Sequence, residues 1–178
     1  MFRSGSSSAG YLPGAKIMTT LSDLVVQPGE WYFGQAPARI STLLGSCVAV
    51  TVWHPILRCG GLCHYLLPNR PTSADALTVP NARYGVDALE LLRCEMIGQA
   101  PLSEYHISCF GGAVMFSGNQ KVGESNAELA HKWLRLHSIT PKQEVLGGNK
   151  GRKIKMDLAT GGIHMEVLDL EWSQGAGI

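Results

Sequence analysis

Residues 48–67 read VAVTVWHPILRCGGLCHYLL, and this stretch decides the fold. Its beginning, Val48–Trp53, is mostly β-branched or aromatic, which is typical of a strand. Gly61–Leu67 predicts a second strand, which ends at Pro68 because proline cannot donate to a strand ladder. Between the two, His54–Leu57 has the length of a four-residue hairpin loop. We therefore expect these strands to pair antiparallel.

The hairpin register places two chemically useful side chains together. With His54–Leu57 as the loop, counting back along both strands puts Cys47 opposite His64. Directly opposed residues share a face, with Cβ atoms about 4.5–5.5 Å apart, so a thiol and an imidazole are within reach of each other. The same register sends Cys59 and Cys63 to the other face of the sheet.

Cys47 therefore stands apart from the other cysteines. The chain has five cysteines, an odd number, and no export signal precedes them, which disfavours a disulfide framework. Free cysteine is usually a small buried residue, and Cys94 and Cys109 fit that description. The alternative for the pair of interest is the same: Cys47 as core filling and His64 as a hydrogen-bonded core histidine.

If Cys47 and His64 do meet, the surrounding residues fit nucleophilic catalysis. A thiol beside an imidazolium has a lowered pKa and becomes a thiolate near neutral pH. Backbone N–H groups around Ser46 and Val48 can face a developing oxyanion, since Gly45 permits a tight turn just before them. A third group must hold the imidazole ring, and the hydroxyls of Ser41 and Thr42 are both candidates. The sequence does not choose between these two.

The rest of the chain predicts two helices and further strands. Residues 81–97 carry apolar side chains at helical spacing, and Ser125 with Glu128 matches a capping box that opens a second helix ending before Pro141. Strands are expected at 107–116, interrupted by two glycines, and at 142–146. Alternating apolar residues at 154–158 and 163–167 predict a hairpin with one buried face. The expected fold is a layered α+β sandwich of mostly antiparallel strands with two main helices.

Composition narrows the function classes. The 178 residues include 15 Lys+Arg against 14 Asp+Glu, so a formal charge of +1 offers no basic footprint for nucleic acid. No apolar run approaches the roughly 20 residues needed to cross a bilayer, which predicts no membrane insertion and a cytoplasmic protein. Residues 1–20 are rich in serine and glycine and are expected to form a flexible tail. Residues 21–178 are expected to form a single domain.

Two other motifs suggest chemistry less strongly. Cys59, Cys63 and His64 resemble part of a zinc site, but structural sites usually have four ligands, and adjacent strand residues point to opposite faces. We expect neither a metal nor another cofactor. The glycine-rich basic segment 147–152 lacks the Gly-Lys-Ser/Thr ending of a phosphate loop and predicts a hairpin turn with an exposed basic tip.

Several motifs together resemble one known family. TLLGSCVAV at 42–50 and GGLCHYLLP at 60–68 resemble the CheD family of chemoreceptor glutamine deamidases. The resemblance continues through ARYG at 82–85, FGGA at 110–113, VGESN at 122–126, GGNKGR at 147–152 and the turn at 160–161. It covers about residues 21–170, in family order, so the series is far more specific than any one motif.

The resemblance implies a function and a set of site residues. The family hydrolyses selected glutamine side-chain amides of methyl-accepting chemotaxis receptors to glutamate and ammonia. Its nucleophilic cysteine matches Cys47 and its histidine matches His64. Its third catalytic residue, a threonine, matches Thr42, with Ser41 as the alternative. Some members also bind a CheC-type phosphatase. Two rival functions remain open: a non-catalytic module that docks on receptors or the phosphatase, and a thiol protease or transamidase.

Overall fold

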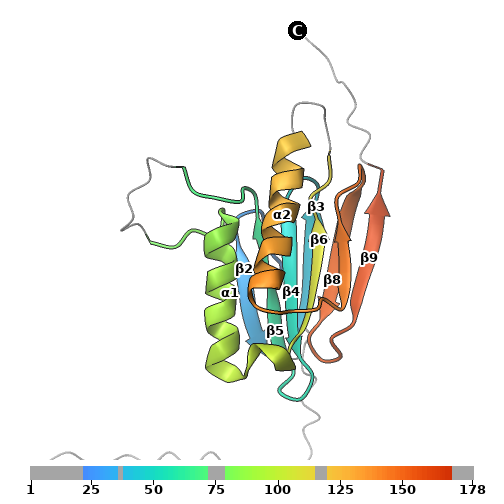
Figure 1. Cartoon of the computed structure of the whole chain (residues 1–178). Helices are drawn as coiled ribbons and strands as arrows, with labels where there is room; N and C mark the ends of the chain where they lie inside the picture. The colour runs from blue at the N-terminus through green and yellow to red at the C-terminus, as the bar shows by residue number, and fades with distance from the viewer. Residues whose placement is uncertain (1–21, 36–37, 72–78, 115–119, 170–178) are drawn as a thin grey trace, which may run out of the picture.

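The computed structural model describes residues 22–35, 38–71, 79–114 and 120–169, which form nine strands and two α-helices (Figure 1). The helices are α1 (Gly85–Gln99) and α2 (Gln120–Leu136), with a 3-10 turn at Leu102–Glu104. The strands are β1 (Ser22–Val25), β2 (Trp31–Gln35), β3 (Ala38–Leu44), β4 (Val48–His54), β5 (Cys59–Tyr65), β6 (His106–Gly111), β7 (Gln143–Leu146), β8 (Gly151–Asp157) and β9 (Ile163–Leu168).

The strands form two sheets. The four-stranded sheet has the order β1-β3-β8-β9, and the five-stranded sheet has the order β2-β5-β4-β6-β7. Only the β1–β3 and β6–β7 pairs are parallel among the described strands. The predicted layered α+β sandwich with mostly antiparallel strands and two main helices is confirmed.

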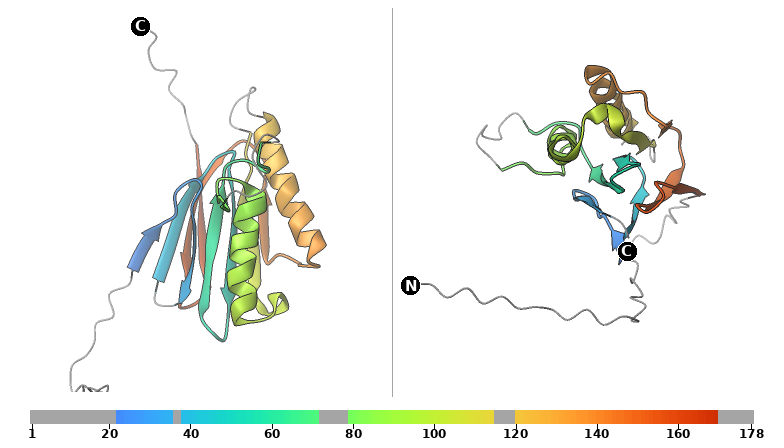
Figure 2. Two further views of the ribbon diagram at one scale, coloured as in Figure 1. Left: turned by 90° about the vertical axis from the view of Figure 1, so that its left-hand side faces the viewer. Right: turned by 90° about the horizontal axis from the view of Figure 1, so that it is seen from below.

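The molecule has three layers, with both helices against the outer side of the five-stranded sheet (Figure 2). One apolar core lies between the helices and this sheet, and it includes Val50 and Cys63 from the strands and Leu92 from α1. A second core lies between the two sheets and includes Ala49 and Leu62. The five-stranded sheet is thus covered on both faces, while the four-stranded sheet is covered on one.

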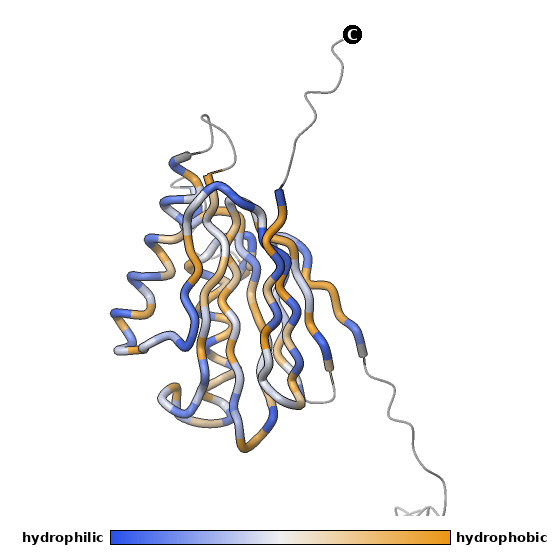
Figure 3. Tube along the Cα trace, turned by 90° about the vertical axis from the view of Figure 1, so that its right-hand side faces the viewer, coloured by the Kyte–Doolittle hydropathy of each residue, from blue (hydrophilic) through white to orange (hydrophobic). Residues whose placement is uncertain are grey.

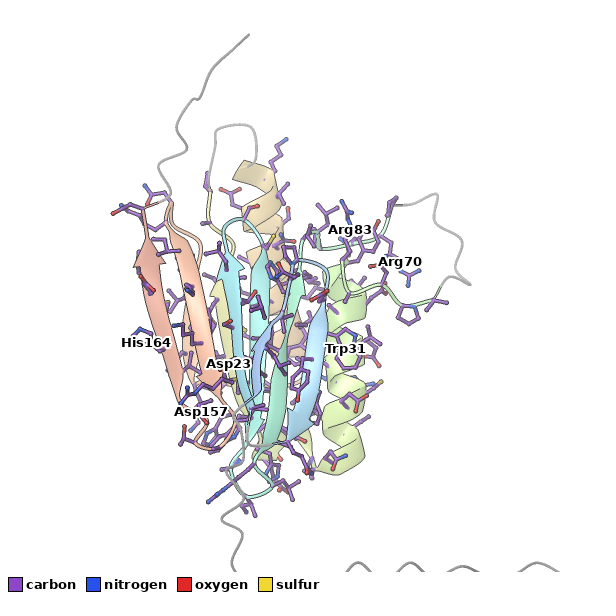
Figure 4. All side chains as sticks on the ribbon, turned by 180° about the vertical axis from the view of Figure 1, so that it is seen from behind. Asp23, Trp31, Arg70, Arg83, Asp157 and His164 are labelled. Carbon is purple, nitrogen blue, oxygen red and sulfur yellow. The ribbon has the colours of Figure 1, made fainter. Side chains whose placement is uncertain are left out.

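Burial on both faces explains the composition of the central hairpin. All seven residues of β5 are buried, as are six of the seven in β4. A strand with two buried faces is expected to be almost continuously apolar, which is what residues 48–53 show. The outer four-stranded sheet alternates instead: Ile40 and Leu44 point inward, and charged side chains stand outward. Figure 3 shows this alternation along its strands, and Figure 4 labels Asp23, Asp157 and His164 on this sheet.

Three strands were not predicted, and one of them matters for the site. No strand was expected at β1, β2 or β3, although β3 has the alternating burial of a half-buried strand. Its inward side chains are Ile40, Thr42 and Leu44. The chain leaves the four-stranded sheet after Leu44 and enters the five-stranded sheet at Val48, so a three-residue segment crosses from one sheet to the other.

The predicted helix starts were wrong. α1 begins four residues later than expected, after Tyr84, and it continues through Gly98. α2 begins at Gln120, so Ser125 and Glu128 lie inside the helix and do not form a capping box at its start. The helix is instead held by tertiary packing, since its apolar side lies on the five-stranded sheet.

The segment 147–152 also differs from the expectation. It is no hairpin turn, because β7 and β8 belong to different sheets, and the segment carries the chain between them. Gly147 and Gly148 both have positive φ, which only glycine adopts freely. Arg152 is 7% exposed, and its guanidinium donates to the carbonyl oxygens of Gly111 and Gly147. The basic group is therefore part of the interior at this end of the fold.

No helix among the described residues is both long enough and apolar enough to span a bilayer. The predicted tail at 1–20 lies outside the residues that the structure describes.

Candidate functional site

The observed hairpin register differs from the predicted one by two positions. His54 remains in β4 and pairs with Cys59, so the four-residue loop is Pro55–Arg58 rather than His54–Leu57. Arg58 takes a positive φ of 49°, and its N–H donates to the His54 carbonyl at 2.9 Å to close the turn. His64 is consequently opposite Ala49, and the prediction that it directly faces Cys47 is wrong.

The shift is even, so it does not change which side chains share a face. Cys47 lies two residues before Ala49 and packs against the core between the sheets, the same core that contains Leu62 two residues before His64. Diagonal neighbours of this kind are about 7–8 Å apart, within reach for long side chains. Cys59 and Cys63 lie in the other core, as predicted.

The His64 ring is held from the opposite sheet by Thr42. The Thr42 Oγ1 lies 2.8 Å from His64 Nδ1 and 2.7 Å from the Val26 carbonyl oxygen, and all of these groups are buried. A carbonyl only accepts, so the single hydroxyl proton goes to Val26 and the hydroxyl oxygen accepts from Nδ1–H. The tautomer is thereby determined: Nδ1 carries the proton and Nε2 has a free lone pair.

Ser41, the other hydroxyl candidate, points away from His64. It occupies the next position along β3, and successive strand residues face opposite sides of a sheet. Its Oγ makes a long 3.5 Å contact with the Leu24 carbonyl oxygen on the neighbouring strand β1. The structure therefore brings Thr42, and not Ser41, to the histidine.

The Nε2 of His64 is buried and has no hydrogen-bond partner among the described residues. The ring is 1% exposed, and burial lowers its pKa from 6.5 to about 4, against the smaller opposing effects of the Val26 carbonyl and the Glu30 carboxylate. An unpartnered buried polar atom is costly and is therefore rare in folded proteins. His64 is a neutral base with an unused acceptor at the inner end of the site.

Cys47 is partly exposed, unlike Cys59, Cys63 and Cys109, which are buried. Burial nevertheless raises the pKa of its thiol, and the backbone N–H of Cys47 itself partly offsets this by stabilising the thiolate. Burial therefore acts against a resting thiolate–imidazolium pair, since it raises the pKa of the Cys47 thiol and lowers that of His64.

The segment that carries Cys47 is held by backbone hydrogen bonds from the residues that follow β6. The Gly45 carbonyl accepts from Ala113 N at 2.9 Å, and the Cys47 carbonyl accepts from Gly112 N at 2.8 Å. Gly111 precedes these donors with φ of 109°, and a Cβ there would run into the Cys47 carbonyl oxygen. Gly111 is thus needed for this close approach.

The Ser46 carbonyl, which lies between those of Gly45 and Cys47, is held by the side chain of Asn126. Ser46 O accepts from Asn126 Nδ2 at 3.0 Å, so three consecutive carbonyl oxygens are occupied. Among the described residues no hydrogen-bond acceptor is found for the Ser46 N–H, and the Cys47 N–H faces its own sulfur. Val48, by contrast, lies within the ladder between Tyr65 and Gly111. Of the predicted oxyanion donors, Ser46 is therefore the better placed.

Among the described residues, no group of three or more His, Cys, Asp or Glu side chains lies close enough together to hold a metal ion. Cys63 and His64 point into different cores, which separates the residues of the suggested zinc motif.

Sequence reasoning missed the residues that support the site. Val26 and Asn126 contribute through a carbonyl and an amide nitrogen, and neither residue type in isolation signals such a role. The glycines at 111 and 112 were noticed as an interruption of a strand, and their close approach to the Cys47 segment is the reason for it.

A partly exposed thiol, an oriented imidazole and the backbone N–H of Ser46 at one end of a two-sheet sandwich define a candidate thiol-dependent acyl-transfer site. Comparison with known proteins agrees with this class. Residues 66–167 match the family model described as CheD, chemotactic sensory transduction. The chain belongs to the CheD family.

Curated relatives match over most of their length. The chain is 38% identical over 149 residues to the probable chemoreceptor glutamine deamidase CheD 3 of Dechloromonas aromatica, covering 80% of this chain and 86% of the relative. It is 40% identical over 148 residues to a CheD 2 of Albidiferax ferrireducens, covering 79% and 84%. It is 36% identical over 156 residues to the CheD of Pseudomonas syringae pv. tomato, covering 84% and 91%.

Proposed function

We propose that this protein is a chemoreceptor glutamine deamidase, which hydrolyses glutamine side-chain amides of methyl-accepting chemotaxis receptors to glutamate and ammonia. The relatives named above are described as probable enzymes of this kind. The observation that carries the assignment of roles is the His64 ring, whose Nδ1 is fixed by Thr42 and whose Nε2 is unused at the end of the core where Cys47 lies. The family match at 66–167 does not include these three residues, so their roles rest on the geometry.

The first step is attack by Cys47 on the glutamine amide carbon. The thiol proton passes to His64 Nε2 as the carbon–sulfur bond forms, because burial favours the neutral form of both groups before the attack. The carbonyl oxygen becomes an oxyanion that the Ser46 and Cys47 N–H groups stabilise. Thr42 keeps the ring oriented throughout, and its hydroxyl accepts from Nδ1–H of the imidazolium.

The second step releases ammonia and the third hydrolyses the thioester. The imidazolium returns its proton to the departing nitrogen as the carbon–nitrogen bond breaks, leaving a Cys47 thioester and free ammonia. Water then attacks the thioester carbon and gives a proton to the neutral Nε2. The carbon–sulfur bond breaks, the sulfur recovers that proton, and the glutamate side chain leaves. No cofactor or metal takes part in this scheme.

The decisive experiment is mass spectrometry of a receptor cytoplasmic fragment incubated with the wild-type protein and with Cys47→Ala. The wild type should convert glutamine to glutamate, a gain of about one dalton (the exchange of NH₂ for OH in the hydrolysis of), with release of ammonia. Cys47→Ala should give neither. Conversion by a correctly folded Cys47→Ala variant would remove Cys47 as the nucleophile.

The same measurement separates the rival functions. Cleavage of the fragment would indicate a protease, and attachment of an amine would indicate a transamidase. Binding of the fragment with no change in mass, equal in wild type and Cys47→Ala, would indicate a non-catalytic docking module.

We further propose a cytoplasmic location, since the substrate glutamines would lie in the signalling region of a receptor. A CheC-type phosphatase is proposed as a second partner. This partner is inferred from the family resemblance alone, and co-purification of the two proteins would test it.

A further inference from the structure

Asn126 connects the two strands of the site through a single nitrogen atom. It lies in α2 and is completely buried. Its Nδ2 donates to the Ser46 carbonyl at 3.0 Å and to the Leu66 carbonyl at 2.8 Å. A primary amide has two N–H donors, so both are used in this arrangement.

The two acceptors lie where strand pairing stops. The β4–β5 ladder ends at the pair Val48–Tyr65, and the segments beyond it no longer pair directly. Ser46 immediately precedes Cys47, and Leu66 follows His64 by two residues. The Asn126 amide therefore takes the place of the next rung of the ladder and holds the cysteine segment beside the histidine strand.

The asparagine is itself held by the residue next to His64. The Tyr65 hydroxyl donates to the Asn126 backbone carbonyl at 2.7 Å, inside the core between α2 and the five-stranded sheet. The bridge consequently has two anchors at this end of β5, one through Tyr65, its last residue, and one through Leu66, which follows it. A movement of α2 along the sheet would therefore shift the cysteine segment relative to β5.

The bridge has a cost that a purely structural residue would avoid. The Asn126 Oδ1 is buried without a hydrogen-bond partner among the described residues. Burying an unpaired polar atom is unfavourable, and an apolar side chain on this face of α2 would not incur that penalty. The arrangement thus favours the two donated hydrogen bonds over the simplest packing.

We propose that Asn126 is a positioning residue for the deamidation, acting through Cys47 by fixing its segment at the distance from β5 that proton transfer to His64 requires. The expected change in kcat rests on the proposed function, whereas the expected change in the alkylation rate of Cys47 rests on the structure alone. Asn126 is buried away from solvent, so it does not contact the receptor.

The test compares Asn126→Ala with Tyr105→Phe. The control also removes one buried hydrogen bond of the helix layer, from the Tyr105 hydroxyl to the Met96 carbonyl at 3.0 Å, but at α1. For Asn126→Ala we expect kcat to fall about 10–100-fold, the range that small misplacements of reacting groups produce, with KM changed by no more than about twofold. Tyr105→Phe should retain wild-type kcat and KM.

The reactivity readout needs no substrate. Iodoacetamide labelling of the native proteins at pH 8 is followed at each cysteine by peptide mapping. Release of the segment exposes Cys47 to water and removes the burial that raises its pKa, so Asn126→Ala should label at Cys47 about fivefold faster or more. Cys63 and Cys109 should stay unlabelled, because both are buried in the helix-side core. The two expected changes are opposite in direction: slower deamidation and faster alkylation.

Each outcome decides the proposal. Unchanged kcat and unchanged Cys47 labelling would overturn it, as would labelling of Cys63 and Cys109 together with Cys47, which indicates general loosening. If Asn126→Ala does not fold, Asn126→Ser, which retains one donor, takes its place under the same criteria. If the wild type fails to deamidate any receptor fragment, the proposed function fails, and the labelling result still decides the role of Asn126.

Discussion

The two ends of the β4–β5 pair each contain a buried histidine, and the two rings differ in how their nitrogens are hydrogen-bonded. His54 stands at the hairpin end, 2% exposed, and His64 at the site end, 1% exposed. The His54 Nδ1 accepts from the Ile56 and Leu57 N–H groups at 3.3 and 3.2 Å. Its Nε2 donates to the Glu104 carboxylate at 3.0 Å, so both ring nitrogens are used.

His64 carries its proton on the other nitrogen and uses only that one. Its Nδ1–H donates to Thr42, and Nε2 has no partner. Burial therefore does not separate a structural histidine from the proposed catalytic one in this fold, since both rings are buried. What distinguishes them is whether the second nitrogen is satisfied, because a structural ring gains nothing from leaving it free.

The sharpest test of this comparison replaces each ring by leucine, which has a similar size and no polar atoms. His64→Leu should lower deamidation about 10²–10⁴-fold, the usual contribution of a general base. Its unfolding free energy should change by less than about 1 kcal/mol, because an unsatisfied atom disappears and the Thr42 hydroxyl still donates to Val26. Ammonia release and urea denaturation measure the two effects.

His54→Leu should show the reverse pattern. It leaves the Ile56 and Leu57 N–H groups and the Glu104 carboxylate without their partner, at a cost of about 2 kcal/mol. Activity per folded molecule should stay within about twofold of wild type, since distant sites act independently. A large loss of activity in folded His54→Leu would break the comparison.

A second prediction concerns pH and His64. Its pKa in the folded protein is about 4, against 6.5 for an ordinary histidine, so the unfolded chain binds more protons between these values. This contribution to stability is therefore fully present above pH 6.5 and is lost as the pH falls toward 4. Linkage gives a loss of about 2 kcal/mol between pH 7 and pH 5.

Other groups titrate in the same range, so the measurement is the difference between wild type and His64→Leu. Urea denaturation at pH 7 and pH 5 should show that the wild type loses about 2 kcal/mol more than the variant. Equal losses in the two proteins would mean that the pKa of His64 is not lowered by folding.

The smallest expected effect separates the two hydroxyls on β3. Thr42→Val keeps the shape and removes the bond that fixes the His64 tautomer, so kcat should fall about tenfold. Ser41→Ala removes a side chain on the opposite face of the strand and should leave kcat within about twofold. Thr42→Ser, which keeps the hydroxyl, serves as the control. A greater loss from Ser41→Ala than from Thr42→Val would reverse the assignment.

Much of the fold could be predicted because β4 is mostly β-branched or aromatic, and because apolar residues alternate along β8 and β9. The hairpin loop was misplaced by one residue on each side, yet the faces of Cys47 and His64 came out correctly. The reason is that moving both ends of a loop shifts the register by two, and strand faces alternate with a period of two.

The contacts that support the candidate site could not be predicted from sequence patterns, for physical reasons. Nothing local in β3 shows that Thr42 meets a ring 22 positions away in another sheet, since that contact depends on how two sheets stack. Asn126 sits in a four-residue pattern that fits a capping box, and only the earlier helix start assigns it another role. The raised pKa of Cys47 and the lowered pKa of His64 likewise follow from burial, which neighbouring residue types do not reveal.

The crossing of the chain from β3 to β4 has a mechanical consequence. Thr42 belongs to one sheet and His64 to the other, and the 2.8 Å contact between them spans the layer that separates the sheets. Sliding one sheet against the other by an ångström or so, with every strand ladder intact, would free the ring to rotate. The orientation of the imidazole therefore depends on how the two sheets stack, and not on the hydrogen bonds within either sheet.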